Sequence, residues 1–247
     1  YRLLTVFSHE EMMQHDRNPV IVHRDLYYES VGLFMARDSR LYLAVKGGDN
    51  DDSHNHNDVG SFTIYKDGKP LFIDAGVETY TKKTFSPDRY DIWTMQSRYH
   101  NLPTFVDHGR ETVQQAGEQY RAADVRYELG ETACRISMDL RQAYPDDRIR
   151  SYSREAMLEK EKSITIRDHY EGDGGTAILS LMFCEKPVID QNTIRIGDLA
   201  ACTVEGASSI TVEEIPVTDE RLKTAWKHNL YRCLVTMEAH DLTLTIV

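Results

Sequence analysis

Residues 60–74 read GSFTIYKDGKPLFID and decide the fold class. Two runs rich in β-branched and aromatic residues flank Asp67-Gly68, a pair that favours the two-residue type I′ turn of a β-hairpin. We therefore predict an antiparallel hairpin on either side of this turn. Because a hairpin returns its second strand to where the first began, Asp74 is expected close to Gly60.

The same kind of sequence continues along the chain, as short runs of Val, Ile, Tyr, Phe and Thr separated by Gly, Asp-Gly and Pro. Tyr28–Ala36 is one such run. In others, such as Leu242, Leu244 and Ile246, apolar residues alternate, so one face meets a core and the other meets water. About a dozen such strands without a long helix predict an all-β protein, a large antiparallel β-sandwich.

The first residues differ from the rest. A short helix is expected from Ser8 onward, ending before Pro19. We interpret residues 1–24 as an entry segment or linker and residues 25–247 as one β-sandwich domain. Because the chain starts at Tyr1 without an initiator Met, we expect it to be a piece of a longer protein.

The formal net charge is −11, and the basic residues are scattered along the chain. No nucleic-acid or membrane partner is therefore expected, although Arg and His gathered in a cleft can still bind an anionic substrate. The four cysteines lie in strand-like runs without a CxxC pair and are expected to be buried free thiols. Unpaired cysteines slightly favour a cytoplasmic over a periplasmic or secreted location. No residue pattern indicates an oligomeric state.

A polar loop at residues 47–58 places His54 and His56 two residues apart. If this segment is extended, both side chains face one site, because alternate residues of an extended chain point the same way. Asn- and Asp-rich loops also commonly serve only as turns. Two further residues favour a metal site: Asp74, a carboxylate ending an apolar strand, and His100, which closes a long loop. Two imidazoles, one carboxylate and an open fourth position suit Zn²⁺.

The long loop from Gly76 to Asn101 shows little strand alternation and mixes aromatic with cationic residues. Loops of this length in compact domains are usually functional or mobile. Its composition suits binding of sugars and carboxylates. Packing of the loop by its own aromatic side chains is the equally weighted alternative.

These features together resemble the heparinase II/III-like family. The similarity is specific from about Tyr28 to Val106, and Arg154 and Asp168 are compatible with it. The resemblance implies a C-terminal β-sandwich that follows an α/α toroid, in lyases that act on heparin, heparan sulfate, alginate and related uronic-acid polymers. The segments that carry it are, in order, His54-Asn55-His56-Asn57-Asp58, Gly60-Ser61-Phe62, Ile73-Asp74-Ala75-Gly76 with Tyr80, and His100-Asn101.

The resemblance also implies roles for individual residues. His56, Asp74 and His100 would hold Zn²⁺, and the affinity for zinc should fall below roughly pH 6 as the imidazoles are protonated. His54 would point into the substrate cleft, where it neutralises the substrate carboxylate or moves a proton. Among the neighbouring positions, Ser61 and Asn101 would fix loops, and Asp58 is a candidate hydrogen-bond partner for a ligand histidine.

In this family a tyrosine on the helical toroid acts as base and acid. Tyr99 and Tyr80 are weak local candidates, because an unperturbed phenol with a pKa near 10 ionises with difficulty. We therefore expect a metal-bearing domain that is inactive alone and acts on an acidic polysaccharide together with a missing helical domain in cis. The alternatives are a non-catalytic carbohydrate-binding β-sandwich and a zinc-dependent hydrolase.

Overall fold

The computed structural model describes residues 7–14 and 24–247. Helix α2, His9–Gln14, buries none of its side chains and confirms the expected short N-terminal helix. Pro19 and most of the predicted entry segment lie outside the described residues. Among the residues described, no helix is both long and apolar enough to span a bilayer.

The predicted hairpin forms as expected. Strand β5, Phe62–Lys66, pairs with β6, Lys69–Phe72, in antiparallel fashion. Asp67 and Gly68 between them have φ values of 51° and 74°. Both are left-handed, as a type I′ turn requires.

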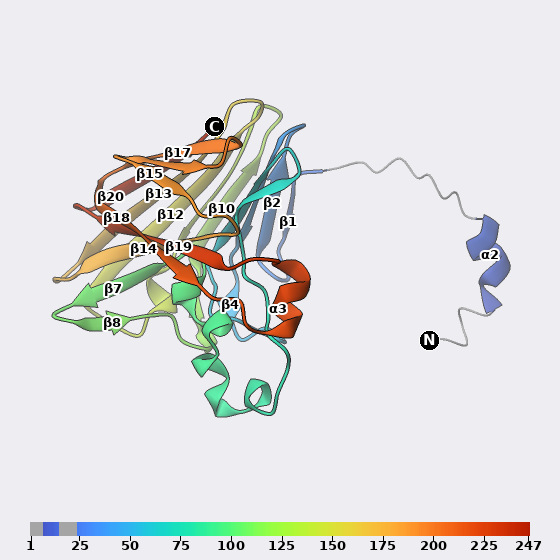
Figure 1. Ribbon diagram of the computed structural model, residues 1–247, viewed down its shortest axis with the longest axis horizontal. Coiled ribbons are helices and arrows are strands. Elements are labelled where there is room, and N and C mark those ends of the chain that lie inside the picture. Colours follow the sequence, from blue (N-terminus) through green and yellow to red (C-terminus); the bar gives the residue numbers. More distant parts are fainter. Residues whose placement is uncertain (1–6, 15–23) are drawn as a thin grey trace.

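The hairpin belongs to a five-stranded sheet with the order β1-β2-β3-β5-β6. A second five-stranded sheet continues it, because Ile73, directly after β6, donates its N–H to the carbonyl of Met182 on β14. The two sheets thus form one layer (Figure 1). Its further strands are β1 Leu26–Tyr28, β2 Leu33–Arg37, β3 Leu41–Lys46, β7 Pro103–Asp107, β8 Arg110–Thr112, β14 Thr176–Phe183, β18 Ala207–Ile215 and β19 Leu230–Met237.

An eight-stranded antiparallel sheet makes the other layer, in the order β10-β11-β12-β13-β20-β17-β16-β15. Strand β3 packs against its strands β12 and β13. Strands β4 and β9 form a separate two-stranded antiparallel sheet. The strands are β4 Asp49–Asn50, β9 Gly117–Arg121, β10 Ala123–Leu129, β11 Ala133–Asp139, β12 Ile149–Glu159, β13 Ser163–Gly172, β15 Val188–Asp190, β16 Thr193–Ile196, β17 Ala200–Glu205 and β20 Asp241–Ile246.

The core lies between the layers and follows the alternation seen in the sequence. In β20, Leu242, Leu244 and Ile246 are buried, whereas the residues between them are not. Leu43 of β3 and Ile166 of β13 join the same apolar cluster from opposite layers. The antiparallel β-sandwich is therefore confirmed.

Several elements differ from the sequence-based expectations. The run Tyr28–Ala36 is not one strand, because the chain turns after β1 and Gly32, at φ 63°, leads into β2. A side chain at Gly32 would also lie 2.4 Å from the backbone nitrogen of Gly48. The described residues form more strands than the dozen or so expected. Strands as short as β4 contain too few residues to show alternation, so the sequence does not reveal them. Helix α3, Glu220–Ala225, was not expected.

The segment 76–101 contains no strand and forms four 3₁₀-helices. It lies at the same end of the sandwich as β4 and α3 (Figure 1). The four are η1 Lys83–Phe85, η2 Pro87–Asp91, η3 Trp93–Met95 and η4 Ser97–Tyr99; a fifth, η5 Arg141–Ala143, precedes β12. All four cysteines are free, as expected, with Cys134, Cys202 and Cys233 buried and Cys184 half-buried.

Candidate metal centre and the neighbouring histidine

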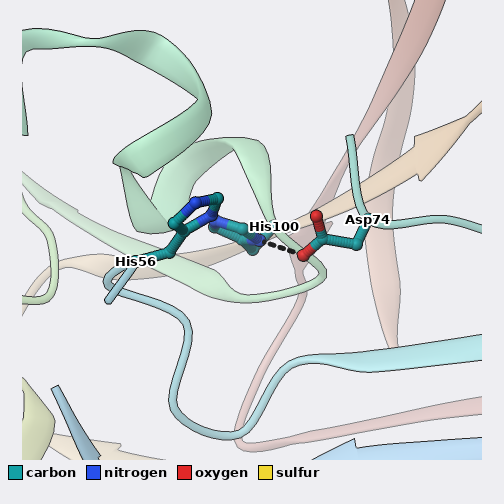
Figure 2. A group of neighbouring side chains, drawn as sticks. All are labelled: His56, Asp74 and His100. Carbon is teal, nitrogen blue, oxygen red and sulfur yellow. Dashed lines mark ion pairs between the residues drawn. The ribbon is translucent and has the colours of Figure 1, made fainter. Parts of the chain in front are cut away.

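Three of the predicted site residues come together at this end of the sandwich. His56, Asp74 and His100 each offer a ligand atom, and these atoms lie within 4.8 Å of one another. The Nδ1 atom of His100 is 3.0 Å from Oδ2 of Asp74, and the rings of His56 and His100 have centroids 5.4 Å apart. Figure 2 shows the two rings side by side, with the Asp74 carboxylate facing His100.

Local chain geometry explains why the three meet. His56 precedes β5, and Asp74 follows β6, so the hairpin brings both to the same sheet end. His100 follows directly after η4. Asp74 is further oriented by accepting a 2.7 Å hydrogen bond from the N–H of Gly76. The centre therefore joins the His loop, the hairpin end and the long loop.

Asn101 fixes the position of His100, as the sequence suggested. Its side-chain amide donates to the carbonyls of Phe62 and Ile73, at 2.6 and 3.1 Å, and its carbonyl accepts from the N–H of Met182 at 2.7 Å. Its backbone N–H donates to Oγ of Ser61. The residue after His100 is thereby bonded to β5, to the end of β6 and to β14.

A buried ion pair supports the same loops from the opposite layer. Arg154 on β12 binds the carboxylate of Asp168, its direct neighbour on β13, through Nε and Nη2 at 2.7 and 2.6 Å. Its Nη1 donates to the carbonyls of Gly60 and Asn101, both at 2.7 Å. Tyr152 also donates to Asp168. Because these charges are paired and hydrogen-bonded, the pair can be accommodated in the core.

The arrangement fits a metal ion. Nε2 of buried His100 has no hydrogen-bond partner among the described residues, and its Nδ1 has only the 3.0 Å contact with Asp74. A buried polar atom left without a partner is costly and indicates an absent ligand. Two imidazoles and a carboxylate are the donor set of many zinc sites. Asp74 keeps 36% of its side chain exposed, which leaves an open side for a further ligand.

The charges of the three groups depend on one another. Burial and the neighbouring His100 lower the pKa of His56 to about 4, so this ring is neutral at physiological pH. Burial opposes protonation of His100, but the Asp74 carboxylate raises the pKa of His100 above its usual range. Although burial acts in the other direction, the histidines hold the pKa of Asp74 below its usual range. Of the three groups, His100 is therefore the one that holds a proton most strongly relative to its usual pKa.

His54 does not face the same site as His56, so the expectation from an extended chain was wrong. His54 has a left-handed backbone, with φ at 64°, in a turn, and its side chain is exposed. Its Nδ1 lies 3.1 Å from the hydroxyl of Tyr80, and the two rings stack with centroids 5.8 Å apart. The two histidines are thus separate in position, in keeping with the different roles that the resemblance implied.

Two other candidates have different surroundings from those expected. Tyr99 packs edge-on against Trp93, with the guanidinium of Arg232 over its ring at 4.5 Å. The tyrosine that contacts His54 is Tyr80. The carboxylate of Asp58 binds Lys46 and no histidine, so the expected hydrogen bond to a ligand is not observed.

Sequence reasoning missed Arg89, which fastens the long loop to the His loop. Its Nε and Nη2 donate to the carbonyl of Asn55, at 3.0 and 2.8 Å, and its Nη1 donates to the carbonyl of Thr84. Only one signal in the sequence pointed to Arg89, its place in a loop that contains several cations. All of these hydrogen bonds are to backbone carbonyls, and no sequence pattern reveals such contacts.

Comparison with known families settles the relationship. The model for the C-terminal domain of heparinase II/III-like proteins matches residues 22–214, most of the chain. The chain belongs to the heparinase II/III-like family. No curated protein sequence matches it.

Several solved structures share the fold of this chain at low sequence identity. A heparinase III matches with a TM-score of 0.68 and 16% identity over 98% of this chain and 38% of its own. A heparan sulfate lyase from Pedobacter heparinus matches with 0.67 and 17%, over 99% and 39%. A 4-α-glucanotransferase from Thermococcus litoralis matches with 0.52 and 12%, over 92% and 39%. The chain thus spans about two fifths of the length of these proteins.

Proposed function

We propose that this chain is the metal-bearing β-sandwich domain of a polysaccharide lyase that cleaves uronic-acid polymers by β-elimination. The observation that carries the proposal is the pairing of the His56, Asp74 and His100 cluster with a separate, exposed His54 at the same loop. Family membership supports it. The heparan sulfate lyase from Pedobacter heparinus has the same fold, and this favours an acidic polysaccharide as the substrate.

His54 is the group of this chain suited to meet substrate. Elimination removes the proton at C5 of a uronate, which is acidic enough only when the adjacent carboxylate is neutralised. When Tyr80 donates its O–H to Nδ1 of His54, the ring proton resides on Nε2, the atom free to donate to that carboxylate. Tyr80 would thus select the tautomer that His54 needs.

His56, Asp74 and His100 are the residues that would hold zinc. The bound ion would supply a fixed positive charge and cross-link the three loops. Asn101 and the Arg154–Asp168 pair hold His100 and the start of β5 in place. These contacts fix the chain at Gly60 and Phe62, which follow the loop that carries His54.

The general base of the reaction is proposed to lie on a helical domain in cis. Within this chain, the hydroxyl of Tyr80 is already bonded to His54, and Tyr99 packs against Trp93. The chain alone is therefore expected to bind its metal and part of the substrate without cleaving it.

The test compares the 247-residue chain with a longer protein that carries it behind a helical domain. Each is incubated with heparan sulfate, heparin and alginate, and the ultraviolet absorbance of unsaturated uronate products is followed. Product is expected only from the longer protein. Release of saturated products would favour a zinc-dependent hydrolase, and binding without cleavage would favour a carbohydrate-binding module. Unsaturated product from the chain alone would place the base within it.

A further inference from the structure

Helix α3 and its flanking residues brace the segment between Asp74 and Tyr80. Trp226 donates from its indole nitrogen to the carbonyl of Ala75 at 2.9 Å. Asp219, which caps α3, also accepts from the N–H of Thr79 at 3.1 Å. A part of the chain about 140 residues away in sequence thus lies against the partner of His54.

The first turn of α3 places Arg221 over the ring of Tyr80. The guanidinium carbon lies 5.1 Å from the ring centroid, and the same ring stacks with His54 at 5.8 Å. Arg221 and His54 therefore both contact the ring of Tyr80. Both side chains are exposed to solvent.

Among the described residues, Arg221 has no carboxylate partner, unlike Lys223 on the same helix. Lys223, two residues on, is paired with Glu220 at 2.7 Å, whereas in the described part of the chain no acidic side chain is paired with Arg221. Cation–π stacking occupies the face of the guanidinium and leaves its N–H groups available. Those N–H groups form a planar fork that matches the oxygens of a carboxylate or sulfate.

We propose that Arg221 forms an anion subsite beside His54, which binds a sulfate or carboxylate on the sugar next to the uronate that His54 contacts. The inference rests on the proposed function, because it takes the ligand to be an anionic polysaccharide. It assigns a specificity role to a residue that does not take part in the chemistry. In a chain with a net charge of −11, a cation left unpaired at this position provides the local attraction that the whole molecule lacks.

Binding of defined oligosaccharides by the chain itself tests this without requiring turnover. Affinities are measured by calorimetry for an N-sulfated heparan sulfate tetrasaccharide and for an unsulfated tetrasaccharide of the same backbone. Arg221→Gln should weaken binding about fivefold, as expected for one exposed ion pair, and should reduce the salt dependence of the affinity. Arg221→Lys keeps the charge without the fork and should recover part of the loss.

Arg110→Gln on β8 is the matched control, because it removes an equal charge from an exposed position at the opposite edge of the sheet from β18 and β19. It should leave the affinity unchanged. An Arg221 effect confined to the sulfated sugar identifies sulfate as the ligand, and an equal effect on both identifies a carboxylate. An unchanged thermal midpoint in Arg221→Gln shows that the loss is not one of folding.

Equal affinities of wild type and Arg221→Gln, or no saturable binding of either sugar by the wild type, would overturn the inference. The proposed function is judged separately by the release of unsaturated product from the longer protein. If the longer protein catalyses elimination but nothing depends on Arg221, the anion subsite is refuted and the lyase proposal stands. If binding depends on Arg221 but the longer protein catalyses no elimination, the lyase proposal is refuted and the chain is an anion-binding module.

Discussion

Replacement of Asn101 by Ala should destabilise the fold and the metal centre together. The side chain of Asn101 is fully buried and bonds three backbone groups, the carbonyls of Phe62 and Ile73 and the N–H of Met182. Alanine would leave all three buried without a partner. Each buried group left unsatisfied costs about 1–3 kcal/mol, so the free energy of unfolding should fall by about 3–5 kcal/mol after partial relaxation.

Urea unfolding followed by tryptophan fluorescence measures this loss, and the thermal midpoint should fall by about 10 °C for a chain of this size. Asn101→Asp keeps the acceptor for Met182 but turns a carboxylate oxygen towards two carbonyls, so it should be at least as destabilising. Asn192→Ala, at an exposed turn, is the control and should change stability by less than about 0.5 kcal/mol.

The affinity for zinc should fall with the stability in Asn101→Ala, because Asn101 positions the neighbouring His100. This is measured by titration with a zinc indicator under conditions in which the variant is folded. A loss of stability below about 1 kcal/mol in Asn101→Ala would refute the reasoning, since it would show that the three backbone groups find other partners.

Three further predictions follow from the geometry of the site. Zinc affinity should fall about tenfold per pH unit as the pH drops through the raised pKa of His100. The fall should start above pH 6.5, and not at the pH of about 6 that the sequence led us to expect. Zinc titrations from pH 8 to 5 that show no such fall would contradict this prediction. His56, with a pKa of about 4, should add to this only in stronger acid. In the longer enzyme, His54→Ala should lower turnover roughly 10²-fold with zinc content unchanged, and loss of zinc measured by elemental analysis would show that His54 is a ligand. Gly60→Ala should lower the free energy of unfolding, measured in urea, by about 3 kcal/mol, because φ of Gly60 is 87° and a Cβ there would lie 2.3 Å from the side chain of Leu140. Gly109 has a similar φ of 79° but open space around it, so Gly109→Ala measures the backbone part of that cost alone.

The sequence could predict the β-sandwich and the meeting of His56 with Asp74 because both depend on short-range geometry. The Asp67-Gly68 turn fixes the hairpin, and the hairpin brings Asp74 back to the His loop. Alternation of apolar residues, as in β20, then marks the face that meets the core. These signals are contained in segments of a few to some twenty residues, so they can be interpreted without knowing the rest of the fold.

Only the tertiary structure decided that the two histidines of this loop, His54 and His56, lie in different places. The left-handed backbone at His54 breaks the extended geometry that would have pointed it the same way as His56. The sequence named Tyr80 as part of the family pattern and as a weak candidate base, but its contact with His54 depends on how the long loop folds back. Residues without a regular repeat adopt conformations set by their neighbours in space, and sequence spacing does not encode these.

The contacts that support the site, and those that add Arg221 to it, join residues that lie even farther apart in the sequence. Arg154 meets Asp168 through the register of β12 and β13, and it reaches Gly60 and Asn101 only because the two layers pack. Arg221 meets Tyr80 because α3, a helix of six residues with a single buried side chain, docks beside the loop. Local sequence thus determined the strands, the turn and the approach of Asp74 to His56. Packing between distant segments determined which side chains surround His54, because the burial and pairing that stabilise those contacts exist only in the folded chain.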